Sequence, residues 1–391
     1  MPSASASSAI ACAAALLALG CGKSAKREAP PAASSASSAS SASSAVRQAG
    51  SLALPPAARA LPGALLLAEH GRLARVELGA ARLTLLAAGA ADAAGLELFP
   101  TAAVSSGGVL AVIASKGHDA DHLEQLALIE GDELRLVGPV AQQVRHPVFS
   151  ADGRSLIFES SHKSFRDLYR LTLAAPSSGG GAASSEELVR LTDNPEGNFE
   201  PTLSADGATL AFTSSRDGDS EIYALDLATR DQARRITAFH RDDWAPAFGP
   251  TKRLAFVSDR EGIDRIFVVA ADGTDLRRAT QEDAREAVEA APTWSSQGAL
   301  AYLRTAAGRA ELLVGAPGAS SWRRLTDATR TVRGFAWSPD GAWLVVLEAA
   351  WSAAAPAAAR TAQLRLLRAD TGEALTLLDP VDLDAVVRWI P

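Results

Sequence analysis

Several features that would point to particular functions are missing from this sequence. The 391-residue chain has only two cysteines, Cys12 and Cys21, so the part that follows them cannot contain an internal disulfide. No cluster of Lys or Arg could follow a phosphate backbone, and the formal net charge is −7, which argues against nucleic acid as a partner. No apolar run reaches the roughly 20 residues that a membrane-spanning helix requires. The Gly-Xaa-Ser-Xaa-Gly pentapeptide of α/β-hydrolases is also absent, and we expect no catalytic serine of that kind.

The N-terminal segment has the features of a secretory leader. Its apolar run, residues 10–19, has the length of a signal-peptide hydrophobic region. Cys21 follows a small residue, and the segment around it resembles the bacterial lipobox, in which such a cysteine is lipidated. We therefore predict a lipoprotein-type signal peptide over residues 1–21 and lipidation of Cys21. Since residue 22 is Gly22 and not Asp, we expect the periplasmic side of the outer membrane or the cell surface. An ordinary signal peptide is the alternative, because Ala18 stands where lipoboxes prefer Leu.

Residues 22–60 are rich in Ala, Ser and Pro and include the low-complexity tract 34–44. A segment of this composition cannot bury enough apolar surface to offset the entropy lost on ordering, so we expect a disordered tether. A flexible coil of this length reaches roughly 30–40 Å. The tether would separate a membrane anchor from a folded domain over residues 61–391.

Within residues 61–391 the sequence repeats itself. The motif Ser-Xaa-Asp-Gly occurs at 150–153, 204–207 and 338–341, and more degenerate copies begin at Pro100, Pro246 and Pro292, so that the spacing is about 43 to 54 residues. Each copy is followed by an apolar run, a polar loop, an alternating run, and in several copies by Arg-Xaa-Thr. Four short strands with tight turns in each repeat are typical of a β-propeller blade.

The repeat also predicts its own local structure. In Ser-Xaa-Asp-Gly, the Asp side chain can bind the turn backbone and Gly accepts a positive φ, which favours a tight hairpin between the first and second strands. The apolar residue before the motif, Phe149, Leu203 or Trp337, should pack between blades.

Counting first strands gives six complete copies, and the two ends of the domain supply a seventh. Residues 64–87 have the pattern of second to fourth strands without a first, whereas residues 385–390 resemble a lone first strand. We therefore predict an all-β propeller of seven four-stranded blades, closed by the C-terminal strand completing the N-terminal blade, with six blades as the alternative. Closure of this kind leaves no free sheet edge in the ring.

The copies over residues 192–280 resemble the propeller repeat of TolB, the periplasmic component of the Tol-Pal envelope system. The same repeat is found in the propellers of prolyl-oligopeptidase-type peptidases. The resemblance implies the fold over about residues 62–391 and is a weak guide to activity, because propellers have many unrelated functions. Neither the α/β domain that precedes the TolB propeller nor the catalytic domain of the peptidases has a counterpart in this chain.

A metal-dependent enzyme is the main alternative to a non-enzymatic binding protein. The chain has six histidines, which we expect in second-to-third or fourth-to-first strand connections, at one end of the ring: His70, His118, His122, His146, His162 and His240. Histidines there could hold a transition metal in a carbohydrate lyase or hydrolase, together with acidic residues. They are spread over several blades without ligand spacing, so we predict no metal and no cofactor. Asp217-Gly218-Asp219 lacks the other positions of a calcium loop and is interpreted as a hairpin, and the Gly run 179–181 as a loop.

Charged residues at the beginnings of the first strands are the better candidates for a site. They should surround the mouth of the central channel and comprise Glu97, Arg145, His146, Glu200, Asp243, Glu289, Arg333 and Asp384. A mostly acidic ring of this kind suits a peptide, a basic segment or a cation. We therefore predict a monomeric, non-enzymatic interaction module that binds an envelope protein or peptide and contacts the membrane only through its lipid anchor.

Overall fold

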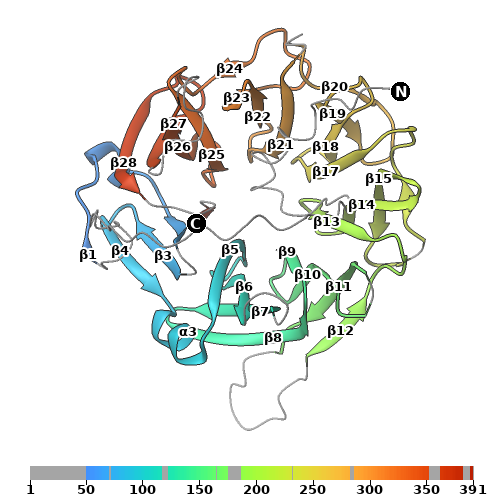
Figure 1. Ribbon diagram of the computed structural model, residues 1–391, viewed down its shortest axis with the longest axis horizontal. Helices are drawn as coiled ribbons and strands as arrows, with labels where there is room; N and C mark the ends of the chain where they lie inside the picture. The colour runs from blue at the N-terminus through green and yellow to red at the C-terminus, as the bar shows by residue number, and fades with distance from the viewer. Residues whose placement is uncertain are drawn as a thin grey trace, which may run out of the picture.

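The computed structural model describes residues 50–69, 72–116, 122–163, 165–174, 186–230, 232–281, 286–351, 362–381 and 388–390. Seven antiparallel sheets surround a central axis, as Figure 1 shows. Six have four strands, and the seventh has a fifth strand on its outer side. The prediction of a seven-bladed propeller is confirmed. Neither helix in the described ranges is long or apolar enough to cross a membrane.

The blades are numbered here I to VII, and their strands are given from the channel outwards. Blade I consists of β29 (Arg388–Ile390), β2 (Ala64–Glu69), β3 (Arg72–Glu77), β4 (Arg82–Leu86) and β1 (Gly50–Ser51). Blade II consists of β5 (Glu97–Val104), β6 (Leu110–Lys116), β7 (Leu123–Glu130) and β8 (Glu133–Ala141). Blade III consists of β9 (Val144–Phe149), β10 (Ser155–Ser160), β11 (Asp167–Thr172) and β12 (Glu187–Arg190). Blade IV consists of β13 (Asn198–Leu203), β14 (Thr209–Asp217), β15 (Asp219–Asp226) and β16 (Arg234–Arg235).

The remaining three blades follow the same order. Blade V consists of β17 (Asp243–Phe248), β18 (Arg253–Ser258), β19 (Arg265–Ala270) and β20 (Arg277–Arg278). Blade VI consists of β21 (Val288–Trp294), β22 (Leu300–Ala306), β23 (Arg309–Gly315) and β24 (Arg323–Arg324). Blade VII consists of β25 (Arg330–Trp337), β26 (Trp343–Ala350), β27 (Ala362–Arg368) and β28 (Ala374–Val381). Two short helices, α2 (Pro56–Arg59) and α3 (Ala88–Ala94), lie outside the sheets.

The ring closes through the two ends of the domain, as predicted. β29 pairs with β2 in antiparallel register, with Leu65 opposite Trp389. The Trp389 indole is buried and donates a hydrogen bond of 3.0 Å to the Pro62 carbonyl. Residues 385–387 of the predicted strand lie outside the described residues.

The predicted boundary of the tether is wrong at its C-terminal end. Residues 50–60 lie on blade I: β1 pairs with β4, and Leu54 and Ala58 are 4% and 0% exposed within the core cluster shared by blades VII and I. The leucines among the Ala and Pro residues give this part of the segment enough apolar surface to pack. Residues 22–49 lie outside the described range.

The Ser-Xaa-Asp-Gly motif forms the hairpin that its sequence predicts. In blade III, Ser150 donates to the Asp152 carboxylate at 2.6 Å, and the Arg154 amide donates to the same oxygen at 3.0 Å. Gly153 has φ +69°, which an L side chain rarely adopts. These hydrogen bonds, led by the one from Ser150, lower the pKa of Asp152.

The hydrophobic core is divided among the seven blade interfaces. Among the described residues, each of seven clusters joins two neighbouring blades. Phe149, Leu203 and Trp337 each pack against one of these clusters, as the repeat predicts. Stability is therefore carried between blades, which leaves the channel and the loops free to differ from blade to blade.

Candidate functional site at the channel mouth

The second-to-third and fourth-to-first strand connections lie on one face of the ring, because consecutive strands of a blade are antiparallel. We call this the upper face. The predicted ring residues within the described ranges all lie in innermost strands of blades II to VII. Two are exposed (Glu97, Arg333), three are half-buried (Arg145, His146, Glu200) and two are buried (Asp243, Glu289). Asp384 lies outside the described residues.

The carboxylates of Asp243 and Glu289 accept hydrogen bonds from other residues of the protein. Asp243 accepts a hydrogen bond of 2.7 Å from Arg260, and Glu289 accepts from the Ile266 amide at 2.9 Å and from the Thr280 hydroxyl at 2.7 Å. Burial raises the pKa of both carboxyl groups. Sequence position alone could not distinguish them from the solvent-facing members of the ring, because side-chain direction alternates along a strand.

The Arg-Xaa-Thr segments supply hydrogen-bond donors to buried carboxylates of the blades. In blade IV, Thr237 donates to Glu221 at 2.5 Å and accepts from the Ile222 amide at 2.9 Å, while Arg235 donates to the same carboxylate at 2.5 Å. The arginine of the fourth strand and the threonine two residues after it thus fix an acidic residue near the start of the third strand. From the sequence alone, Arg-Xaa-Thr was recognised only as the last segment of several repeats.

Blades III and IV share a charge cluster, which we call the channel cluster. It consists of the buried Glu159 and Arg166 and the half-buried His146 and Glu200. Glu159 is 1% exposed in β10, and its carboxylate lies 3.3 Å from His146 Nδ1 and 3.0 Å from Arg166 Nε. It also accepts a hydrogen bond of 3.2 Å from the Glu200 amide of blade IV. The Arg166 guanidinium stacks on the Phe199 ring at 4.1 Å. Charge is therefore buried beside the channel, at the junction of two blades.

The backbone at this junction has an unusual conformation. Four innermost strands contain a residue with φ between +48° and +54° directly before a proline, at a bulge: His146, Glu200, Ala245 and Ala291. Such conformations cost about 1–3 kcal/mol each for a residue other than glycine. The carboxylates offset this cost, since Glu159 binds the amide of Glu200, and Glu200 in turn binds the amide of Ala245 at 2.8 Å.

Blades V and VI show that the repeat does not require charge here. Their bulge residues are alanines, and the residue that corresponds to Glu159, after the buried aromatic of the second strand, is Val257 in blade V and Leu303 in blade VI. The sequence did contain a signal for the channel cluster, because Glu159 interrupts the apolar run of β10. The sequence analysis missed this signal.

The charges of the channel cluster stabilise one another. Burial opposes the charge of His146, but its hydrogen bond to Glu159 and the charges of Glu159 and Glu200 outweigh burial and raise its pKa. Burial likewise opposes the charge of Glu159, but His146 and Arg166 outweigh it and lower its pKa. Each of these two side chains therefore favours the charged form of the other.

The other described histidines lie in separate blades. His122 binds Glu124 at 2.9 Å, His162 packs edge-on against Tyr169, and His240 packs against Phe239. Contrary to expectation, His146 lies within β9 and not in a connection. In the described ranges, no three His, Cys, Asp or Glu side chains gather as metal ligands.

Two further sequence expectations concern loops. Asp217 and Asp219 pair across the β14–β15 hairpin, in agreement with the prediction. His70, His118 and the Gly run 179–181 lie outside the described residues.

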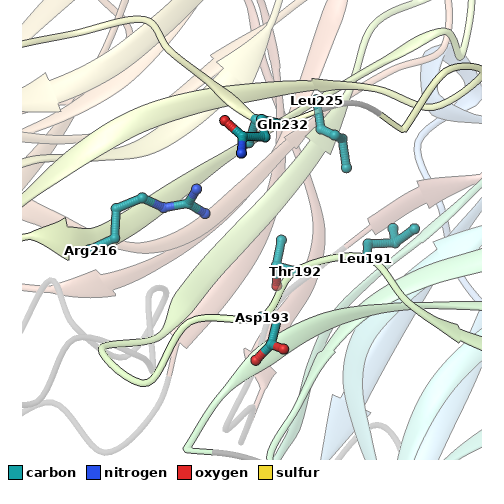
Figure 2. A pocket seen from close by; sticks show the side chains of 7 residues that line it. Leu191, Thr192, Asp193, Arg216, Leu225 and Gln232 are labelled. Carbon is teal, nitrogen blue, oxygen red and sulfur yellow. The ribbon is translucent and has the colours of Figure 1, made fainter.

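A polar groove lies between blades III and IV (Figure 2). Its volume is about 350 Å³, and it is lined by Leu191, Thr192, Asp193, Arg216, Leu225, Gln232 and Ala233. The Arg216 side chain extends into it from one side, while Thr192 and Asp193 lie across from it (Figure 2).

Comparison with known proteins identifies similar propellers. A family model described as the TolB beta propeller domain matches residues 182–353. The TolB homolog of Chlorobium luteolum is 26% identical over 151 residues, which cover 38% of this chain and 31% of the relative. The Tol-Pal system protein TolB of Francisella tularensis is 30% identical over 128 residues, which cover 32% and 27%. The matched region thus spans less than a third of the length of these relatives.

Solved structures share the fold at low sequence identity. TolB from Acinetobacter baumannii superposes with a TM-score of 0.50 at 19% identity, covering 81% of this chain and 77% of that structure. A prolyl endopeptidase gives 0.59 at 15% identity, covering 80% and 49%, and puromycin hydrolase gives 0.58 at 16%, covering 85% and 56%. Residues 182–353 are therefore similar to the TolB β-propeller domain, and the propeller fold also occurs as part of larger peptidases.

Proposed function

We propose that this protein is a non-enzymatic binding module of the cell envelope that engages a protein or peptide partner at the mouth of its channel. The observation that carries the proposal is the channel cluster. His146 and Glu200 occupy strained backbone positions that other blades fill with alanine, and a buried carboxylate holds them there. Strain and buried charge that the fold itself does not require are features of functional sites.

The surroundings of the channel cluster suit a protein partner. Phe165, in the β10–β11 connection beside Arg166, is 67% exposed on the upper face. An exposed aromatic ring next to charged groups is a common anchor in protein interfaces. Glu97, exposed at the start of β5, and Arg333, exposed within β25, extend the charged surface around the channel.

Two observations support a location in the cell envelope: the N-terminal segment resembles a lipoprotein signal peptide, and matched relatives are envelope proteins by name. A lipid on Cys21 and a spacer that ends before residue 50 would hold the propeller near a membrane surface as a monomer. Matched relatives are named as Tol-Pal system proteins, which supports an envelope partner for this chain as well.

Site-specific photo-crosslinking in living cells tests this function. A photoreactive phenylalanine analogue replaces Phe165 on the upper face, and in the matched control it replaces Leu276, which is 41% exposed in the β19–β20 connection on the opposite face. We expect one discrete crosslinked envelope protein from position 165 and none from position 276. No adduct at position 165, or the same adducts at both positions, would contradict an upper-face partner.

A further inference from the structure

Blades IV and V contain the same arginine stack with different partners. In blade V, Arg260 lies 4.6 Å from the Phe267 ring centroid, and its Nη2 donates to the Asp243 carboxylate at 2.7 Å. In blade IV, Arg216 lies 4.4 Å from the Tyr223 ring, and its Nη2 donates to Asn198 Oδ1 at 3.0 Å. The two arginines are held alike, but a neutral amide replaces the carboxylate in blade IV.

Arg216 therefore lacks a counter-ion in the described part of the chain. No carboxylate oxygen described there forms an ion pair with it, and no hydrogen-bond acceptor is found for its Nη1. Asn198 cannot supply charge, and its amide nitrogen donates instead to Asp167 at 2.7 Å. The open edge of this half-buried guanidinium can therefore form a charge-assisted hydrogen bond with an anion from solution.

The unpaired guanidinium faces the groove between blades III and IV (Figure 2). Its position is fixed by the aromatic stack, by the bond to Asn198 and by a bond of 3.0 Å from Nε to the Ser214 hydroxyl. Such a fixed planar group loses little entropy when it binds a carboxylate. The groove volume of about 350 Å³ is within the range of small-ligand sites.

We propose that this groove binds a carboxylate with an adjacent N–H donor, the chemistry shared by a peptide C-terminus and an N-acylated amino acid. Arg216 would bind the carboxylate, and the Asp193 side chain, 83% exposed across the groove, would accept the N–H. The carboxylate of Asp193 disfavours a phosphate dianion in the same space, although Arg190 pairs with it at 2.8 Å. This site is separate from the channel cluster and does not depend on the function proposed for it.

Isothermal titration calorimetry on the full-length chain tests the proposal. The probes are N-acetylalanine and N-acetyl-trialanine, each compared with its C-terminal amide. We expect the free carboxylates to bind and the amides not to bind. Arg216→Gln should weaken binding about tenfold or more, because a charge-assisted hydrogen bond is lost. Arg216→Lys keeps the charge without the planar fork and should give an intermediate loss.

The control is Arg323→Gln, which removes the same charge from an exposed position in β24. It should leave binding unchanged. Thermal melts would show that every variant is folded. If N-acetyl-trialanine binds and N-acetylalanine does not, the ligand is a peptide C-terminus. If both probes bind comparably, the ligand is an N-acylated amino acid. Equal binding of acid and amide, no binding at about 10 mM ligand, or an equal effect of both glutamine variants would overturn the proposal.

Discussion

Removing the charge of Glu159 is the most informative perturbation of the channel cluster. Glu159→Gln keeps the side-chain shape but removes the buried negative charge that lies 3.0 Å from Arg166 Nε and 3.3 Å from His146 Nδ1. Breaking a buried ion pair in this way costs about 3–5 kcal/mol. We expect the free energy of unfolding to fall by about that amount, and the melting temperature by about 5–10 °C.

The pH dependence of the loss identifies its source. The pKa of His146 is raised above its ordinary 6.5, so its contribution is present below that pH and disappears as pH rises through the raised pKa. The pKa of Glu159 is lowered below its ordinary 4.5, so its contribution is present above that pH and disappears as pH falls through the lowered pKa. The difference between wild type and Glu159→Gln should therefore be largest between pH 4.5 and 6.5. It should be smaller on either side of this range.

Urea unfolding at several pH values measures both effects. The control is Glu97→Gln, which makes the same charge change at an exposed position of the upper face and should alter stability by no more than about 0.5 kcal/mol. A loss below about 1 kcal/mol for Glu159→Gln, or a loss that does not vary with pH, would refute the stabilising role assigned to this carboxylate.

Three other predictions follow from single contacts. Trp389→Ala removes a buried indole from the closing strand and should destabilise the ring by about 3–5 kcal/mol, measured by urea unfolding. Thr237→Val leaves the buried Ile222 amide without its acceptor and should cost about 1–3 kcal/mol in the same assay. Burial and the hydrogen bond to Asp217 raise the pKa of Tyr223 to about 12, so Asp217→Asn should lower the pH at which this phenol ionises, followed by ultraviolet absorbance.

Each has a control. Thr376→Val, at an exposed position of β28, should be nearly neutral, and a comparable loss there would contradict the specific role of Thr237. Wild-type stability of Trp389→Ala would show that ring closure does not depend on the indole. An unchanged Tyr223 titration in Asp217→Asn would assign the shift to burial alone.

The fold could be predicted from the sequence because the turns of each blade depend on residues that are close together in the chain. A Ser-Xaa-Asp-Gly hairpin depends on residues within a few positions of one another, such as Ser150 and Asp152, and its effect on the backbone does not depend on the rest of the fold. Three clear copies of that motif, the degenerate copies at similar spacing and the unmatched strand ends at the two termini were enough to predict the number of blades and the closure of the ring.

The site depended on contacts between blades, which local patterns do not specify. Glu159 and Glu200 are separated by 41 positions yet share a hydrogen bond, and the burial of Asp243 and Glu289 depends on what the adjacent strands place around them. Arg216 and Arg260 have similar local sequence surroundings. Among the described residues, the partner on the first strand is the neutral Asn198 for Arg216 and the carboxylate of Asp243 for Arg260. The sequence by itself therefore determined the blade and its repetition, through short-range hydrogen bonds and periodicity. Only the tertiary structure decided which charges are neutralised, because that depends on side chains brought together by ring closure and blade packing.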